Sequence, residues 1–189
     1  MTPRKRVIVI TGVPGTGKTR ISGLLAGRLK DAEVIHATEL IRARGLFSSR
    51  DRDGTKVVRM KALERELGRI AEASRSRYVI MEGHILCDLG VRGADAVVLR
   101  EHLGVLRKRL EARGYGREKT MANLVSEATD YCGANAGRHY RKVYEIFPGQ
   151  RGALAELVRI AEGKRVAMRE IDLLGELISI IKNGKDFVA

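Results

Sequence analysis

The segment Gly12-Val13-Pro14-Gly15-Thr16-Gly17-Lys18-Thr19 fits the spacing G-x-x-x-x-G-K-[ST] at every fixed position. The residues just before it, Arg6-Val7-Ile8-Val9-Ile10, form a β-branched run without polar alternation, which predicts a strand buried on both faces. Apolar residues recur at helical spacing over the next stretch, which predicts a helix from about Lys18 to Leu29. A strand, a glycine-rich turn and a helix in this order predict a P-loop that holds the phosphates of a nucleotide.

The residues of this loop have separate expected roles. The glycines let successive backbone N–H groups turn toward phosphate oxygens, which a Cβ atom would obstruct. Lys18 is expected to reach the β- and γ-phosphates, and Thr19 to offer its hydroxyl to Mg²⁺. A glycine loop with only a structural role is the alternative, and the flanking strand and helix argue against it.

Short β-branched runs alternate with helical patterns along the remaining chain, as in an α/β domain whose parallel sheet carries helices on both faces. Further strands are expected at residues 34–35, 78–81, 94–99 and 143–147. Helices are expected at residues 39–44, 57–74, 102–112, 120–130, 153–161 and 167–181. Residues 45–56 show no periodicity and are rich in Ser, Gly, Arg and Asp, so a mobile insertion is expected there.

The composition indicates one folded domain spanning residues 1–189. The chain weighs 20.9 kDa, and its 44% hydrophobic and 31% charged residues are typical of a folded protein. No apolar run approaches the roughly 20 residues that span a bilayer. Cys87 and Cys132 are far apart and lack CxxC spacing, which argues against a disulfide framework and a zinc knuckle. A reducing, cytoplasmic location is therefore expected.

The net charge of +13 predicts attraction to polyanions such as nucleotides or RNA. A generally basic surface with no specific partner is the alternative. Aromatic residues make up only 4% of the chain, so the stacking platform of a single-strand RNA binder is not visible.

The P-loop by itself is shared by kinases, GTPases and motor ATPases. A GTPase would need an NKxD or TKxD element to read the base, and the sequence contains neither. A motor ATPase would usually need a longer chain. The small size, the irregular segment after the second strand and the Arg-rich segment after the fourth favour a nucleotide kinase, which must close over two nucleotides and exclude water.

Four stretches carry a family resemblance: the P-loop, residues 36–42 (HATELIR), residues 79–84 (VIMEGH) and residues 98–115 (VLREHLGVLRKRLEARGY). They resemble the adenylate kinase family typified by human adenylate kinase isoenzyme 6, including its archaeal members. Asn123 falls where that family has an Asn in the following helix. The resemblance covers roughly residues 6–165, and its most specific part is the RLxxRGY motif at the end of the fourth stretch.

The resemblance implies a nucleoside monophosphate kinase fold with a five-stranded parallel sheet in the order 2-3-1-4-5. It implies an acceptor-nucleotide region at residues 36–55 and a lid at residues 112–122. The implied reaction is reversible transfer of a phosphoryl group from Mg·ATP to AMP, giving two ADP. Residues 167–189 exceed the resemblance and are expected to form a C-terminal helical extension. The apolar stripe of that extension either packs on its own core or binds a partner.

The resemblance also implies which residues contact the substrates. The expected ATP-binding residues are Gly12, Gly15, Gly17, Lys18, Thr19, Arg20 and Arg113. The family often has Thr where Arg20 stands, so only the backbone contact of that residue carries over. Arg109 and Arg113 are expected to stabilise charge on the transferring phosphoryl group. A solvated basic face of a helix is the alternative for both arginines.

Two further residues follow the third strand. Glu82 stands where the family has Asp, and it is expected to hold Mg²⁺ either directly or through a bound water. His84 is expected to act catalytically by orienting a water or sensing the γ-phosphate; a loop histidine without a role is the alternative. Arg100 is interpreted as a residue that supports the site or binds the acceptor. His36, His102 and His139 match no catalytic motif.

A second function from another class follows from the same resemblance. Relatives of this type act in maturation of the small ribosomal subunit, which contains 16S rRNA, and bind a ribosomal protein of the uS11 type. A role in ribosome assembly beside rRNA, with ATPase activity, agrees with the charge of +13. An assembly ATPase with little or no AMP kinase activity is therefore the alternative function.

Overall fold

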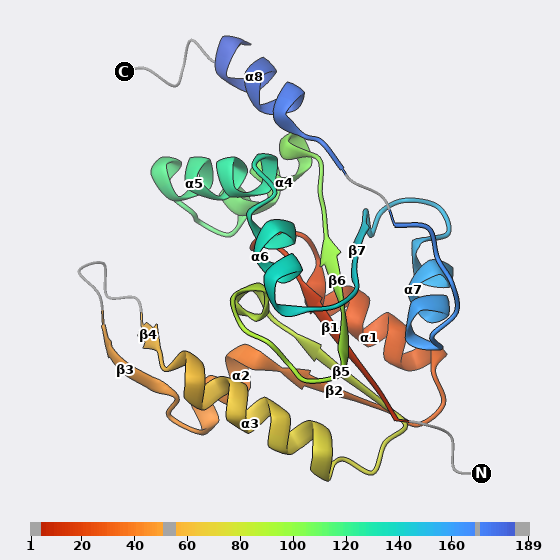
Figure 1. Cartoon of the computed structure of the whole chain (residues 1–189). Coiled ribbons are helices and arrows are strands. Elements are labelled where there is room, and N and C mark those ends of the chain that lie inside the picture. Colours follow the sequence, from red (N-terminus) through yellow and green to blue (C-terminus); the bar gives the residue numbers. More distant parts are fainter. Residues whose placement is uncertain (1–4, 51–55, 169–170, 184–189) are drawn as a thin grey trace.

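The computed structural model describes residues 5–50, 56–168 and 171–183. Its centre is a sheet of five strands that all run parallel (Figure 1). In spatial order these are β2 (Ala32–His36), β5 (Tyr78–Glu82), β1 (Arg6–Thr11), β6 (Ala94–Leu99) and β7 (Val143–Ile146). Numbered along the chain within this sheet, the order is 2-3-1-4-5, so the predicted fold class and strand order are confirmed.

Helices cover both faces of the sheet because alternate side chains of each buried strand point to opposite sides. On one face, Ile8 and Ile10 pack with α1 (Lys18–Arg28) and α7 (Ala153–Ala161). On the other face, Val9 packs with a larger set of helices: α3 (Met60–Ala73), α4 (Leu103–Ala112), α5 (Arg117–Ala128) and α6 (Tyr131–His139). Figure 1 shows α3 on the opposite side of the sheet from α1 and α7. None of the helices in the described part of the chain is both long and apolar enough to cross a membrane.

The segment after β2 differs from the expectation. A short helix, α2 (Ala37–Ala43), is followed by β3 (Phe47–Arg50) and β4 (Lys56–Val58), which pair antiparallel as a separate two-stranded sheet. Residues 45–56 were predicted to form a mobile insertion without regular structure; that prediction missed strands β3 and β4, and α3 begins later than expected. The remainder of the predicted insertion, residues 51–55, lies outside the described residues.

Helix α6 was not predicted, and the chain reaches it through a sharp turn at Asp130. The backbone of Asp130 is left-handed, with φ of 52°, and its side chain accepts a hydrogen bond from the backbone N–H of Gly133 (3.2 Å). This side-chain cap starts a new helix directly after α5. The sequence of α6, YCGANAGRH, is poor in large apolar residues, so helical periodicity could not reveal it.

In the described part of the C-terminal extension, helix α8 (Leu174–Asn183) begins seven residues later than predicted. Leu177 packs into the core, whereas Leu174, Ile178 and Ile181 are exposed. Glu176 fastens α8 to the start of α4: its carboxylate accepts a hydrogen bond from the backbone N–H of Leu103 (2.8 Å) and lies 2.6 Å from His102 Nδ1. Residues 169–170 and 184–189 of the predicted extension lie outside the described residues.

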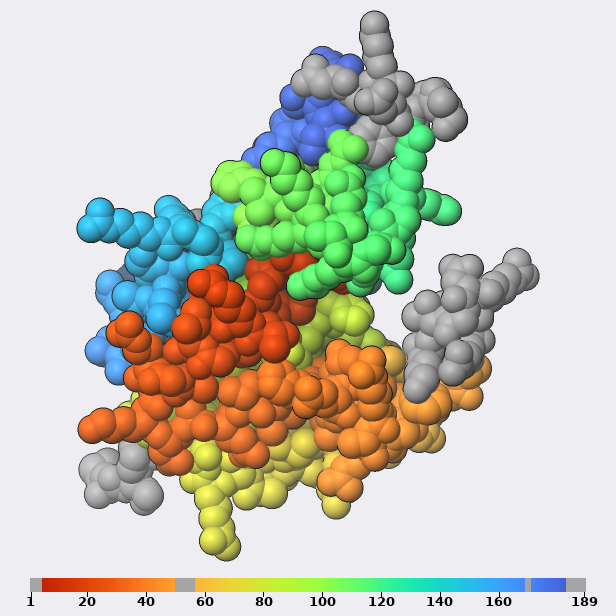
Figure 2. Space-filling model, turned by 180° about the vertical axis from the view of Figure 1, so that it is seen from behind, coloured from red at the N-terminus to blue at the C-terminus, as the bar shows by residue number. Residues whose placement is uncertain are grey.

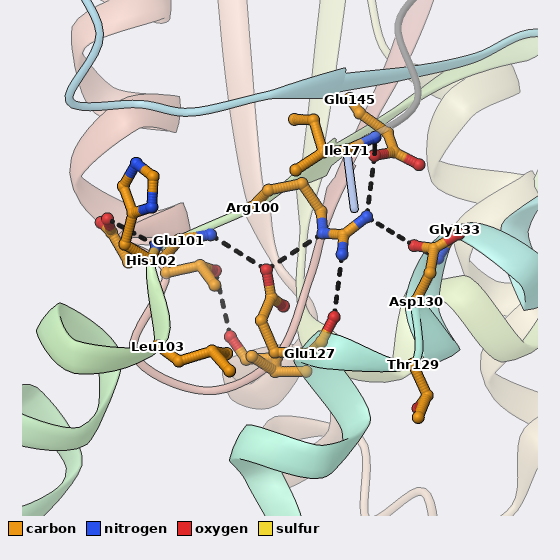
Figure 3. A network of polar contacts seen from close by, with 12 residues as sticks. Arg100, Glu101, His102, Leu103, Glu127, Thr129, Asp130, Gly133, Glu145 and Ile171 are labelled. Atoms are coloured by element: carbon orange, nitrogen blue, oxygen red, sulfur yellow. Dashed lines mark hydrogen bonds and ion pairs between the residues drawn. The ribbon is translucent and has the colours of Figure 1, made fainter. Parts of the chain in front are cut away.

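Arg100, the residue after β6, is the largest fully buried side chain among the described residues, with 1% exposure. Figure 3 shows its guanidinium surrounded by carboxylates from three elements. Nε donates to Glu127 Oε1 of α5 (3.0 Å), and Nη1 donates to Asp130 Oδ1 (2.8 Å) and to Glu145 Oε2 of β7 (2.7 Å). Glu145 Oε2 also accepts the backbone N–H of Ile171 (3.0 Å), so the network reaches the C-terminal extension.

Burial opposes the charge of Arg100, but Glu127, Glu145 and Asp130 outweigh it and raise the pKa of the guanidinium above its ordinary value. Burial raises the pKa of Glu127 and of Glu145, while Arg100 acts in the opposite direction on both. The position of Arg100 at the carboxyl end of β6 suggested a supporting or acceptor-binding role. The structure shows that the acceptor-binding role is wrong, because the guanidinium is buried and its hydrogen bonds go to other groups of the protein.

Replacing Arg100 with Met leaves buried carboxylates without their counter-ion. We expect the variant to lose roughly 3–5 kcal/mol of unfolding free energy at neutral pH, measured by urea denaturation. Without Arg100 the folded-state pKa of Glu127 and Glu145 rises further. In the variant, the folded state therefore binds protons at these carboxyl groups at a higher pH than the unfolded state does. The variant should regain stability relative to wild type as the pH falls from neutral toward the ordinary carboxyl pKa of about 4.3.

The matched control is Arg100→Lys, which keeps the charge but not the fork of donors, and it should lose less stability than Arg100→Met. A stability difference between wild type and Arg100→Met that is small, or that does not narrow toward acid pH, would contradict this account.

Candidate nucleotide-binding site

The P-loop connects β1 to α1 and keeps a tight turn that requires glycine at two positions. Gly12 has φ of +133°, and a Cβ atom there would lie 2.5 Å from the carbonyl oxygen of Leu99. Gly15 has φ of +97°, and a Cβ atom there would lie 2.7 Å from Leu106 Cδ1 of α4. Positive φ together with close packing excludes L side chains at both positions. The loop is therefore held against β6 and α4.

The N-terminus of α1 is arranged to receive an anion. Its N-cap residue is Gly17, which supplies no side-chain hydrogen bond to the first turn. No N-cap side chain therefore accepts hydrogen bonds from the first backbone N–H groups of the helix. The positive end of the helix dipole lies at the same place. A phosphate group placed here would supply the missing acceptors.

Lys18 stands at the start of the helix with its ammonium turned back over the loop. Nζ donates to the carbonyl oxygens of Gly12 (2.9 Å) and Val13 (3.0 Å). Burial lowers the pKa of Lys18 to about 8, although the nearby Glu82 carboxylate acts in the opposite direction. The ammonium is a compact positive charge with little water around it, so an approaching phosphate would be attracted strongly.

A cavity of about 500 Å³ opens beside this loop. We call it the nucleotide cavity; its lining residues are Pro14, Gly15, Gly17, Lys18, Thr19, Arg20, Thr38, Glu82, Gly83, His84, Arg113 and Tyr115. Figure 2 shows the red P-loop segment between the orange residues that follow it and the overhanging green α4 region, and the surface is hollowed between them. The predicted residues Gly15, Gly17, Lys18, Thr19, Arg20, Glu82, His84 and Arg113 all line this cavity.

Two predicted residues lie beside the cavity rather than in its lining. Gly12 lies beneath the loop, where its carbonyl oxygen binds Lys18. Arg109 extends from α4 and donates through Nη1 to the carbonyl oxygen of Gly15 (3.1 Å) and to Glu101 Oε2 (2.6 Å). Arg109 therefore braces the P-loop from outside.

Thr19 and Glu82 meet at one edge of the cavity. The Thr19 hydroxyl donates to Glu82 Oε1 (3.2 Å), and Glu82 is the last residue of β5. The donors present are a hydroxyl and one carboxylate; the described residues contain no cluster of three or more His, Cys, Asp or Glu that could bind a metal alone. This set fits Mg²⁺, which uses one or two protein oxygens together with phosphate oxygens and water.

His36 is a site residue that the sequence analysis set aside. Its Nδ1 lies 2.7 Å from Glu82 Oε1, the same oxygen that Thr19 contacts. His36 ends β2, and the parallel register places it opposite Glu82 at the end of the neighbouring strand. The predicted strand order already made β2 and β5 neighbours, so a search for polar residues at adjacent strand ends could have found this pair.

His84 begins a 3₁₀ helix, η1 (His84–Asp88), and its side chain is exposed at the mouth of the cavity. Partial desolvation and the neighbouring Lys18 ammonium lower the pKa of His84, so its ring is neutral at physiological pH. The backbone of His84 is fixed by Thr11, whose buried hydroxyl donates to the His84 carbonyl oxygen (3.1 Å).

The two arginines of the RLxxRGY motif differ in their contacts. Arg109 is bound to Gly15 and Glu101, whereas the Arg113 side chain makes no hydrogen bond or ion pair with the part of the chain that the structure describes. Arg113 is exposed and lines the cavity, and its charge acts on Lys18. Two arginines one helical turn apart therefore differ: Arg109 holds the P-loop in place, whereas Arg113 presents its charge to the cavity.

This difference predicts two distinct kinetic effects. Arg113→Ala should lower kcat by about 10²–10³-fold with little change in thermal stability, because a cation that lines the cavity without any ion pair to the described residues is removed. Arg109→Ala should chiefly raise KM for ATP and lower the melting temperature, because the P-loop loses its brace. Steady-state kinetics and thermal denaturation measure both effects.

Lys108→Ala is the matched control, since it removes an exposed positive charge from the same helix. Arg109→Ala and Arg113→Ala variants with the same kinetic profile as each other would contradict the division of roles.

Comparison with known proteins agrees with this geometry. The family model described as "AAA domain" matches residues 8–130, which include the P-loop, Glu82, His84 and both arginines. A protein from Methanothermobacter thermautotrophicus named "Putative adenylate kinase" is 38% identical over 147 residues, covering 74% of this chain and 78% of the relative. A protein of the same name from Archaeoglobus fulgidus is 32% identical over 181 residues, covering 90% and 93%.

Solved structures share the fold at low sequence identity. Shikimate kinase from Bacteroides thetaiotaomicron has a TM-score of 0.57 at 20% identity, covering 84% of this chain and 96% of that one. The tunicamycin resistance protein of Deinococcus radiodurans has a TM-score of 0.57 at 19% identity, covering 88% and 100%. At this identity the similarity supports the P-loop kinase fold alone. The family match and the archaeal relatives show that the chain belongs to the AAA-domain family, together with the archaeal proteins named "Putative adenylate kinase", and is a phosphotransferase of the P-loop kinase class.

Proposed function

We propose that the protein is an adenylate kinase, which transfers the γ-phosphoryl group of Mg·ATP to AMP and releases two ADP in a reversible reaction. The observation that carries this proposal is the nucleotide cavity, where Lys18, the uncapped start of α1 and Arg113 all face one space. The names of the archaeal relatives support AMP as the acceptor. Support for the ATP side comes from the P-loop.

In this mechanism the protein positions two nucleotides and neutralises charge, and no covalent intermediate is needed. Bound Mg²⁺ would supply charge neutralisation at the phosphates, and Thr19 and Glu82 are the residues that would hold it. His36 orients Glu82 through its ring nitrogen. Lys18 exchanges its contacts with the loop carbonyls for phosphate oxygens, and Arg113 approaches the transferred group.

The acceptor is proposed to bind over residues 36–55 and the lid to comprise residues 112–122. In support, Thr38 of α2 and Tyr115, which follows α4, line the same cavity from opposite sides. Residues 112–122 span the end of α4, a four-residue turn and the first part of α5. Closure of this turn over the cavity would exclude water from the transferred phosphoryl group.

A second activity is proposed beside the first: ATP hydrolysis linked to assembly of the small ribosomal subunit. The supporting observations are the net charge of +13 and His84, a neutral ring at the mouth of the cavity where a water molecule could be oriented. A ribosomal protein of the uS11 type and rRNA are the proposed partners, in the cytoplasm. An assembly ATPase with little AMP kinase activity is the alternative.

The decisive experiment measures ADP formation by the purified protein with Mg·ATP, with and without AMP. We expect AMP to raise ADP formation many-fold, with two ADP formed per ATP consumed. Lys18→Ala should lower this rate at least about 100-fold, because the phosphates lose their main cation. Lys30→Ala, at an exposed position after α1, is the matched control. ADP formation that is independent of AMP but stimulated by the ribosomal protein would establish the assembly ATPase instead.

His84 separates the two activities. His84→Ala should reduce phosphate release from ATP in the absence of AMP by about 10-fold or more, because a water is no longer oriented, and should reduce AMP phosphorylation less. Phosphate release and coupled ADP assays on the same preparation measure the ratio. His139→Ala, an exposed histidine outside the cavity, is the control. Equal losses in both activities would show that His84 serves the cavity as a whole.

A further inference from the structure

Cys87 and Cys132 are 45 residues apart in sequence, but their sulfur atoms lie 3.5 Å from one another. Both thiols are free and buried, with exposures of 1% and 5%. Cys87 belongs to η1, and Cys132 is the second residue of α6. The proposed phosphoryl transfer uses neither thiol.

Polar contacts on both sides of the thiols hold η1 against α6. Asp88 Oδ1 accepts hydrogen bonds from the Tyr131 hydroxyl (3.0 Å) and from Asn135 Nδ2 (2.9 Å). The Tyr140 hydroxyl, at the other end of α6, donates to the carbonyl oxygen of Leu86 (2.8 Å). The two sulfur atoms therefore face each other across a fixed interface.

Cys87 is also connected to the nucleotide cavity. Its sulfur lies 3.1 Å from the carbonyl oxygen of His84, the same oxygen that Thr11 contacts. A disulfide requires the sulfur atoms at about 2.05 Å, so they must approach by roughly 1.5 Å. Disulfide formation also removes the Cys87 S–H, so the carbonyl oxygen of His84 loses this donor at the mouth of the cavity and keeps the Thr11 hydroxyl.

We propose that Cys87 and Cys132 form a reversible intramolecular disulfide, and that its formation opposes nucleotide binding at the P-loop. The oxidant is a small-molecule disulfide. The Cys87 thiolate attacks one of its sulfur atoms, and the first small thiol leaves with the proton lost by Cys87. Cys132 sulfur then attacks Cys87 sulfur, and the second small thiol leaves with the proton of Cys132. Two protein thiols are oxidised and one small disulfide is reduced.

The order of the two steps follows from the pairing. Pairing with Cys132 lowers the pKa of the Cys87 thiol, while the same pairing and burial raise the pKa of Cys132. Cys87 is thus the attacking thiol, and Cys132 resolves the mixed disulfide. Intracellular disulfides of this reversible kind are usually redox-sensing, so the pair agrees with the reducing compartment expected from the sequence.

The test equilibrates the full-length protein in buffers of increasing oxidised-to-reduced glutathione ratio, with and without Mg²⁺ and a non-hydrolysable ATP analogue. Acid-quenched samples are analysed by intact mass. The disulfide form is a monomer about 2 Da lighter than the reduced chain. Because the chain has only two cysteines, this mass identifies the Cys87–Cys132 bond. We expect the analogue to raise the glutathione ratio at half-oxidation by roughly fivefold or more.

Cys87→Ala and Cys132→Ala are the controls, and neither can produce the lighter monomer. Glutathione adducts or linked dimers in place of the lighter wild-type monomer would overturn the disulfide. A midpoint that the analogue does not move would overturn the coupling. This coupling rests on the proposed function, so calorimetry measures analogue binding to the reduced protein separately. Absence of binding there would contradict the nucleotide site, whereas the mass alone decides the disulfide.

Discussion

The fold depends on one buried charge, the guanidinium of Arg100, enclosed by carboxylates that reach it from α5, α6 and β7. A buried cation is costly unless its hydrogen bonds are satisfied, so these elements must meet at the end of β6. The same network continues outward to Ile171, which ties the C-terminal extension to the sheet. Helices α5 and α6, strand β7 and the segment at Ile171 are thus all connected, directly or through Glu145, to the charge of Arg100.

The network also supports the nucleotide site. Glu127 accepts the backbone N–H of Glu101 (2.9 Å), Glu101 binds Arg109, and Arg109 holds the carbonyl oxygen of Gly15. A continuous series of charged hydrogen bonds therefore runs from the buried Arg100 to the P-loop. Such bonds are stronger and more directional than contacts between neutral groups. The phosphate-binding loop is fixed from both sides, by the glycine packing beneath it and by this series beside it.

The carboxyl ends of the strands supply the remaining site residues. His36 and Glu82 end neighbouring strands, and Thr19 reaches the same carboxylate from α1. Ligands gather at this edge in open α/β sheets because parallel strands deliver their polar ends together. The interface of η1 with α6 joins this edge to the Arg100 network, since Asp130 both caps α6 and contacts Arg100.

Local sequence determined much of this protein. The P-loop spacing, the β-branched runs and the helical periodicity were sufficient to predict an α/β domain with a parallel sheet and the P-loop residues of the cavity, because each depends on neighbours within a few positions. The strand order and the cavity residues Glu82, His84 and Arg113 were predicted from the family resemblance. Residues 47–50 and 56–58 pair as two short antiparallel strands, and α6 begins at a left-handed cap, so neither has a periodic signal. Only the tertiary structure decided that Arg100 is structural, that Arg109 braces while Arg113 remains uncommitted, that His36 joins Glu82, and that two distant thiols meet. Those assignments depend on which side chains face one another across separate elements, and burial and charge pairing settle that only after the chain has folded.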